Sequence, residues 1–117
     1  TCVAENVGCK AVLLNPAVHP ARDLAKYIGE QTSWHNPQER FFFRPEFVDE
    51  LQALVPPKLA KPENYFAVIA KGDEVLDWRE MTARYAGARI KLLEGGDHAL
   101  SDFDDHIDEV LAFLNLI

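Results

Sequence analysis

The sequence lacks a long apolar run and is short of basic residues. No apolar stretch approaches the roughly 20 residues that a membrane-spanning helix needs, so we expect no membrane partner. Acidic residues outnumber basic ones by 19 to 12, and the formal net charge is -7. Binding of nucleic acid phosphates needs clustered Lys and Arg, so we expect no nucleic acid partner either. These shortages predict a cytoplasmic protein.

Cysteine is also scarce. The only two are Cys2 and Cys9, which form no CxxC pair and have no histidine cluster beside them. This usage is typical of reduced, structural thiols rather than of a redox or metal site. We therefore expect no cofactor and no metal at the cysteines.

Three short apolar runs predict the strands of one α/β domain. The 117 residues, 48% of them apolar, suffice for a single core. Each run stops at turn-forming residues, as buried strands of a parallel sheet do. The runs are Ala11–Leu14 before Asn15-Pro16, Tyr65–Ala70 before Lys71-Gly72-Asp73, and Ile90–Leu93 before Gly95-Gly96.

Helical spacing appears around these strands. Trp78, Met81, Thr82 and Tyr85 predict a helix that ends before Gly87, and a strand-helix-strand crossover makes the strands on either side parallel. At the chain ends the apolar residues again follow helical spacing. They are Val3, Ala4 and Val7 before a Gly8 cap, and Phe103, Ile107, Val110, Leu111 and Leu114 after acidic helix-start signals that begin at Ser101.

A long connection, residues 17–64, interrupts the predicted domain of residues 1–117. It contains a short helix over 21–27, a polar, turn-rich stretch over 31–40, the aromatic triplet Phe41-Phe42-Phe43, and a helix over 45–55. Connections of this length in a compact domain usually form a lid or a binding element. We therefore predict a lid-like insertion, with a supporting flap that contacts no substrate as the alternative.

Asp73 and His98 are the candidate site residues. Asp73 follows one predicted parallel strand and His98 follows the next, so both should lie at the same edge of the sheet. A carboxylate beside a histidine can fix its tautomer and stabilise the imidazolium that forms during proton transfer. Asp77 is a competing acid, but its position is more typical of a helix N-cap.

Two other interpretations of His98 remain open. The histidine could simply form hydrogen bonds within its loop, without any role in chemistry. It could also bind a metal together with Asp97 and Asp102, although no second histidine lies at ligand spacing.

Three segments in order along the chain resemble small bacterial esterases of the YqiA type, which are single-domain α/β-hydrolases. They are NPAVHP (Asn15–Pro20), GDEVLDWR (Gly72–Arg79) and EGGDHA (Glu94–Ala99). The resemblance implies a serine esterase acting on acyl esters, with thioesters as a second possibility. It implies that Asp73 is the acid and His98 the base of the catalytic triad. Asn15-Pro16 would line the pocket near the nucleophile, or merely end a strand.

The sequence departs from this family pattern at the nucleophile. Such esterases carry Gly-x-Ser-x-Gly on a sharp turn, and this motif does not occur here. The only serines are Ser33, in the polar part of the insertion, and Ser101, which is better explained as a helix cap. Residues 1–7 resemble the end of the helix that follows the nucleophile. We therefore expect the chain to be the C-terminal part of an α/β-hydrolase, without the nucleophile and the oxyanion hole.

The resulting prediction has three parallel strands, flanking helices and a long lid-like insertion. The intact enzyme would hydrolyse esters, and this chain alone would be inactive. The alternative is a non-catalytic interaction module or a degenerate hydrolase homologue, in which Asp73 and His98 are relics. The strand Ala11–Leu14 carries no charge or proline that would protect an exposed edge, so we also expect self-association through it.

Overall fold

The computed structural model describes residues 1–32 and 40–117, which form two compact units. The first unit contains Thr1–Val18 and Pro57–Ile117, and the second contains His19–Pro56. Ser33 and most of the predicted polar stretch lie outside the described residues. No described helix is both long and apolar enough to cross a membrane.

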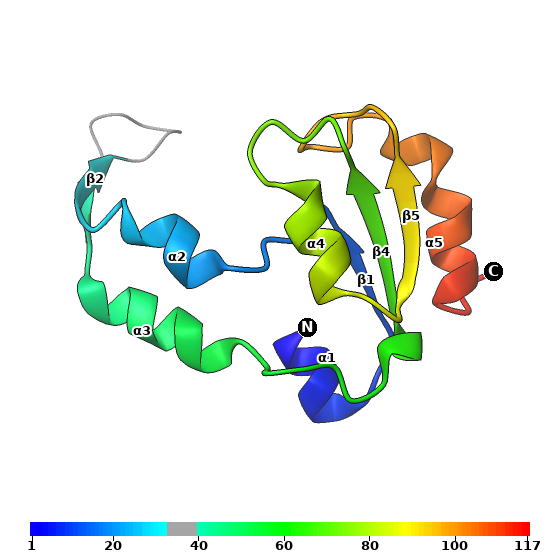
Figure 1. Ribbon diagram of the computed structural model, residues 1–117, viewed down its shortest axis with the longest axis horizontal. Coiled ribbons are helices and arrows are strands. Elements are labelled where there is room, and N and C mark those ends of the chain that lie inside the picture. Colours follow the sequence, from blue (N-terminus) through cyan, green and yellow to red (C-terminus); the bar gives the residue numbers. More distant parts are fainter. Residues whose placement is uncertain (33–39) are drawn as a thin grey trace. The chain divides into compact units, whose positions relative to one another are not determined.

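The first unit is built on a three-stranded parallel sheet with the order β1-β4-β5. Its strands are β1 (Ala11–Leu14), β4 (Tyr65–Ala70) and β5 (Arg89–Leu93), which confirms all three predicted strands and their parallel direction. Every residue of β4 is buried, as expected for a central strand that is covered on both faces. Figure 1 shows that β4 and β5 point the same way, so the loops that follow them leave the sheet at one edge.

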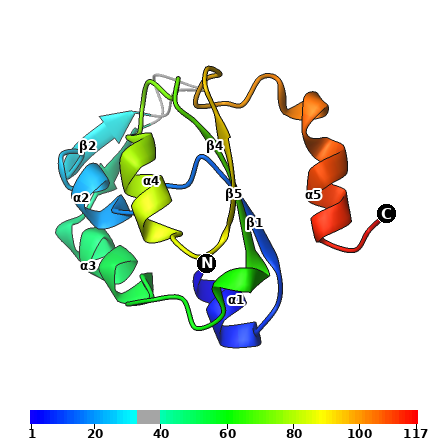
Figure 2. The same ribbon diagram turned by 45° about the vertical axis from the view of Figure 1, so that its right-hand side comes forward.

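Helices cover both faces of this sheet, which gives the predicted α/β class. Figure 2 shows α4 (Trp78–Arg84) and α5 (Ile107–Phe113) on opposite sides of the strands. Side chains of β4 alternate between the two faces because successive residues of a strand point in opposite directions. Tyr65, Ala67 and Ile69 pack with α1 (Cys2–Val7) and α4, whereas Phe66, Val68 and Ala70 pack with Leu100 and α5.

The helices α1 and α4 form where the sequence predicts them. Gly8 ends α1 with a φ of 77°, a left-handed conformation that glycine adopts without steric cost. Only Ala4 of the predicted apolar face of α1 is buried, while Val3 and Val7 are exposed. In α4 the expected residue Met81 is buried, and Tyr85 is buried at its C-terminal end.

The C-terminal helix differs from the prediction. The expected continuous helix from Ser101 is divided into a 3-10 turn, η2 (Phe103–Asp105), and α5, with His106 between them. Val110 of the predicted apolar face is buried, and Phe103 and Leu114 pack against the same core cluster. Phe113 packs edge-to-face on Phe66 with 5.5 Å between ring centroids, whereas Ile107 is exposed.

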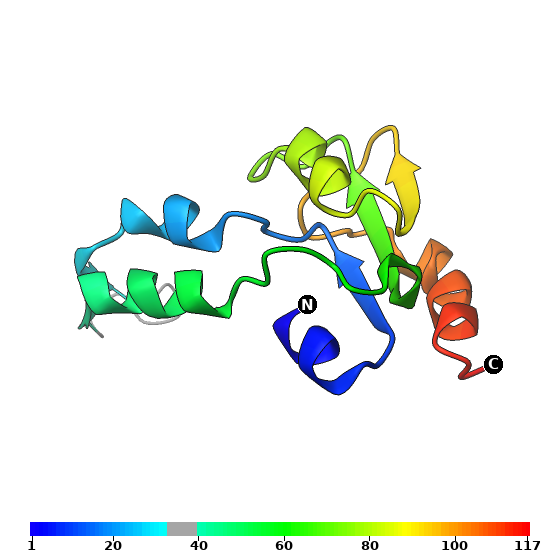
Figure 3. The ribbon, with the colours of Figure 1, turned by 60° about the horizontal axis from the view of Figure 1, so that its bottom comes forward.

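The second unit consists of two helices and a two-stranded antiparallel sheet. The helices α2 (Pro20–Ala25) and α3 (Pro45–Leu54) lie side by side (Figure 3), and β2 (Gly29–Thr32) pairs with β3 (Arg40–Phe43). The sequence does not predict this pairing, because Gly-Glu-Gln-Thr lacks the apolar alternation of a strand. No residue of α3 is buried, so its predicted apolar face is only partly covered. The role of this unit as a lid stays a prediction.

Candidate active site

Asp73 lies in the tight loop that follows β4. Its backbone N–H donates to the carbonyl of Ala70, at 3.2 Å. Its Oδ1 atom accepts hydrogen bonds from the backbone N–H groups of Val75 (2.7 Å) and Leu76 (2.8 Å). The side chain is completely buried. Because the loop itself occupies Oδ1, the carboxylate is held in a fixed orientation with Oδ2 directed to its other partner.

That partner is His98, in the loop that follows β5. Its Nδ1 atom lies 2.7 Å from Oδ2 of Asp73, and 39% of the histidine side chain is exposed. An ionised carboxylate can only accept, so in neutral His98 the hydrogen resides on Nδ1 and Nε2 is left as the basic nitrogen. Among the described residues no hydrogen bond reaches Nε2. The predicted contact is confirmed, and the catalytic roles stay a prediction.

The two loops touch through their glycines. Gly72 donates its N–H to the carbonyl of Gly95 at 3.1 Å. A Cβ atom on Gly72 would lie only 2.3 Å from the carbonyl oxygen of Gly96. No side chain fits between the loops at this point, so the approach of the acid loop to the base loop depends on glycine.

Glu74 makes a contact with His98 that the sequence does not predict. Its Oε2 atom accepts the backbone N–H of His98 at 3.1 Å, and the residue is exposed. The only indication in the sequence is that Glu74 is an acidic residue directly after Asp73, in the same loop. The direction of its side chain depends on the turn after Asp73, which spacing alone does not determine.

Asn15 is the second unforeseen contact. It is buried, with 3% of its surface exposed, and its φ of 44° at the end of β1 confirms the strand-ending turn. Its Nδ2 atom donates to the carbonyl oxygens of Asp97 (2.9 Å) and His98 (3.0 Å). Its Oδ1 atom accepts the N–H of Ala70 at 2.8 Å. Asn15 thus does more than end a strand.

The competing acid, Asp77, has the structural role that the sequence indicates. It is the N-cap of α4, and its Oδ1 atom accepts the backbone N–H of Arg79 at 2.9 Å. Its carboxylate also forms an ion pair with the Arg79 guanidinium. The structure therefore pairs His98 with Asp73 and uses Asp77 to cap a helix.

The prediction that Ser101 caps a helix is wrong. Its backbone N–H and its hydroxyl both bind the carboxylate of Asp97, at 3.0 and 2.8 Å, in a turn before η2. These bonds, the backbone one first, stabilise the ionised carboxylate and lower the pKa of Asp97. Asp97 closes the turn around His98 by binding Ser101, four residues further along the chain. Helical structure therefore starts later than expected, at η2.

The metal interpretation of His98 finds no support in the described part of the chain. Asp97 binds Ser101, and Asp102 lies 3.1 Å from Nε2 of His106. Within residues 1–32 and 40–117, no group of three His, Cys, Asp or Glu side chains could hold a metal ion. Cys2 and Cys9 are free thiols, and because Cys9 is exposed it does not contribute to the core.

The family of the chain follows from a comparison over nearly its full length. The model of a family described as "Uncharacterised protein family (UPF0227)" matches residues 1–115. The chain belongs to this family. The matched range includes all three segments that resemble YqiA-type proteins, and with them Asn15, Asp73 and His98.

Proposed function

We propose that this chain supplies the acid and the base of an esterase-type serine hydrolase that acts on acyl esters, with thioesters as a second substrate class. The observation that carries the proposal is the buried Asp73 carboxylate, 2.7 Å from Nδ1 of the half-exposed His98. The pair lies beyond the carboxyl ends of neighbouring parallel strands, where open α/β sheets bind ligands. Family membership and the order of acid before base along the chain also support it.

The geometry suits a proton relay through His98. Asp73 would keep the hydrogen on Nδ1, so that Nε2 takes the proton of a serine hydroxyl as its oxygen attacks the ester carbonyl. The resulting imidazolium would then give that proton to the departing alkoxide or thiolate as the acyl bond breaks. A water molecule would release the acyl group by the same two proton transfers.

The nucleophile of this proposal is a serine outside the 117 residues. In the part of the chain that the structure describes, Ser101 is the only serine, and its hydroxyl is held by Asp97. The sequence also contains no Gly-x-Ser-x-Gly motif. The proposal therefore concerns the native polypeptide with any segment before Thr1, and it predicts this motif there.

Hydrolysis of p-nitrophenyl acetate and butyrate by the native polypeptide tests the proposal. We expect turnover above the uncatalysed rate, and a loss on the order of 10³-fold or more in His98→Ala with an unchanged circular dichroism spectrum. A parallel thioester series with the same acyl groups separates the two substrate classes. A folded protein with no turnover on either series would instead favour the degenerate homologue.

A further inference from the structure

We infer that Asn15 is a positioning residue, which holds the His98 loop in register with the acid loop and so keeps the imidazole on Asp73. The inference rests on the proposed function, because it concerns the geometry of the same Asp73–His98 pair. Asn15 lies at the end of β1, and its buried side chain contacts the last residue of β4 and the loop that follows β5.

Both polar atoms of the Asn15 amide are hydrogen-bonded. Both of its N–H bonds have an acceptor, the carbonyl oxygens of Asp97 and His98, and its oxygen accepts the N–H of Ala70. Ala70 is the last residue of β4, three positions before Asp73. One side chain therefore connects the peptide groups that precede the acid with those that flank the base.

The backbone of Asn15 fixes where this amide lies. Its N–H donates to the carbonyl of Val68 at 3.0 Å, which continues the pairing of β1 with β4 by one residue. The positive φ turns the side chain out of the strand, and asparagine tolerates that conformation better than most residues. The pairing of β1 with β4 therefore fixes the position from which the amide contacts Ala70 and the His98 loop.

The position of His98 depends on two anchors of different kinds. Exposed Glu74 holds the backbone N–H of His98, whereas buried Asn15 holds its carbonyl oxygen. Loss of the buried anchor would leave the partly buried carbonyl groups of Asp97 and His98 without this partner, and a movement of the loop would relieve that cost. Such a movement would displace the imidazole from Oδ2 of Asp73.

A turn alone does not require this residue. Glycine and aspartate also adopt positive φ, but only asparagine offers two donors and an acceptor within the same short side chain. Asn15→Asp therefore keeps the size and the acceptor for Ala70, and replaces the donors by an oxygen that faces two carbonyl groups. Asn115→Asp is the matched control, since Asn115 is exposed after α5 and has a φ of 61°.

The test compares these variants in the native polypeptide by two measurements. Long-range ¹H–¹⁵N spectra report which nitrogen of His98 carries the hydrogen, and ester hydrolysis gives kcat and KM. We expect Asn15→Asp to lose the single Nδ1–H form and to lower kcat roughly 10- to 100-fold with little change in KM. Asn115→Asp should match the wild type in both.

Two outcomes separate this inference from the proposed function. If the wild type does not hydrolyse esters but Asn15→Asp still changes the His98 tautomer, then the function is wrong and the positioning stands. If Asn15→Asp folds and leaves the tautomer and kcat unchanged, the inference is overturned. Should Asn15→Asp not fold, Asn15→Gly keeps the backbone conformation without the amide, and an unchanged tautomer there overturns it equally.

Discussion

The Oδ2 atom of Asp73 lies 2.7 Å from Nδ1 of His98, although the two residues are 25 positions apart in the chain. They meet because β4 and β5 are parallel neighbours whose following loops leave the sheet at one edge. The carboxylate is completely buried, while more than a third of the imidazole side chain is exposed. This asymmetry leaves the acid protected and the base accessible, as proton transfer to a substrate requires.

Gly72→Ala should destabilise the site, because its Cβ would lie 2.3 Å from the carbonyl oxygen of Gly96. Backbone must move to relieve this overlap, and we expect a loss of about 1–3 kcal/mol in the free energy of unfolding. Gly95→Ala is the control, since a Cβ there meets nothing within 4 Å. Urea unfolding of both variants makes the comparison. Equal midpoints would mean that the two loops do not approach each other as closely as described.

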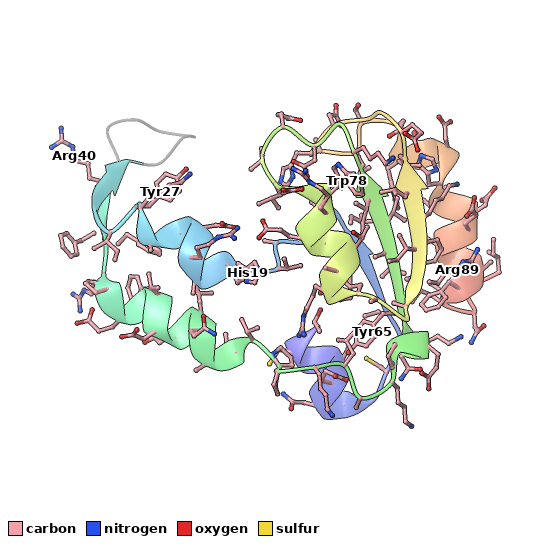
Figure 4. All side chains as sticks on the ribbon, viewed as in Figure 1. His19, Tyr27, Arg40, Tyr65, Trp78 and Arg89 are labelled. Atoms are coloured by element: carbon pink, nitrogen blue, oxygen red, sulfur yellow. The ribbon has the colours of Figure 1, made fainter. Side chains whose placement is uncertain are left out.

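Tyr65→Phe should make the protein less sensitive to alkaline pH. Tyr65 lies at the start of β4, on the side of the sheet that α1 and α4 cover (Figure 4). Burial, and then the nearby negative charge of Glu5, raises the pKa of Tyr65 to about 12. In the unfolded chain this tyrosine loses its proton near pH 10. Its contribution to the free energy of unfolding is therefore constant below pH 10 and falls as the pH rises towards 12.

The free energy of unfolding at pH 9 and pH 11.5 measures this effect. We expect the wild type to lose about 2 kcal/mol more than Tyr65→Phe over this interval. Tyr27→Phe, at an exposed tyrosine, should behave like the wild type. If Tyr65→Phe and the wild type lose the same stability, then the Tyr65 hydroxyl is not held in its neutral form by the fold.

The 117-residue polypeptide itself should hydrolyse an activated ester no faster than its His98→Ala variant. In the described part of the chain the only serine, Ser101, is bound to Asp97 and is not directed at His98. The rate with p-nitrophenyl acetate, relative to buffer, is the measurement. Robust turnover that depends on His98 would contradict the proposal, and would make Ser101 or Cys2 the candidate nucleophile.

The 117-residue polypeptide should also self-associate through the edge of β1. In the described residues β1 pairs only with β4, and Leu14 at its end is 44% exposed. An unpaired apolar edge recruits other chains, and a lysine at such an edge opposes this. We expect micromolar wild type to form dimers or larger species by light scattering, and Leu14→Lys to shift it towards monomer.

Leu116→Lys is the control for this experiment, because Leu116 is exposed in the C-terminal segment after α5. It adds the same charge to the protein away from the edge strand and should not change the association. A monomeric wild type with slow amide exchange along Ala11–Leu14 would show that this edge is already covered.

Much of the first unit could be predicted from the sequence, because its signals are local and strong. Continuous apolar runs that stop at glycine or proline predicted three strands, of which β4 is the fully buried one. Helical spacing from Trp78 to Tyr85 predicted the crossover helix. Strand direction then brought Asp73 and His98 to one edge without any knowledge of loop structure. The N-cap role of Asp77 was likewise predictable, because capping depends on neighbouring residues.

The remaining features depend on contacts that spacing does not encode. Asn15 binds peptide groups more than 50 residues away, and Glu74 contacts His98 only because of the turn between them. Ser101 preceded an acidic run and resembled a cap, but Asp97 binds it in a separate turn. In the second unit, polar residues 29–32 pair with the aromatic strand β3, and their composition gave no sign of a strand.

Comparison of Asp73→Asn with Asp77→Asn in the native polypeptide tests whether Asp73 orients His98 as the base. The asparagine at position 73 can still accept the N–H groups of Val75 and Leu76 through its oxygen, but its amide would then face Nδ1 of His98. His98 would carry its hydrogen on Nε2 and could not act as the base. We predict that Asp73→Asn lowers kcat for ester hydrolysis by on the order of 10³- to 10⁴-fold, with Asp77→Asn close to wild type. Full activity in a folded Asp73→Asn variant, or an equal loss in both variants, would contradict the role of Asp73 as the acid that orients His98.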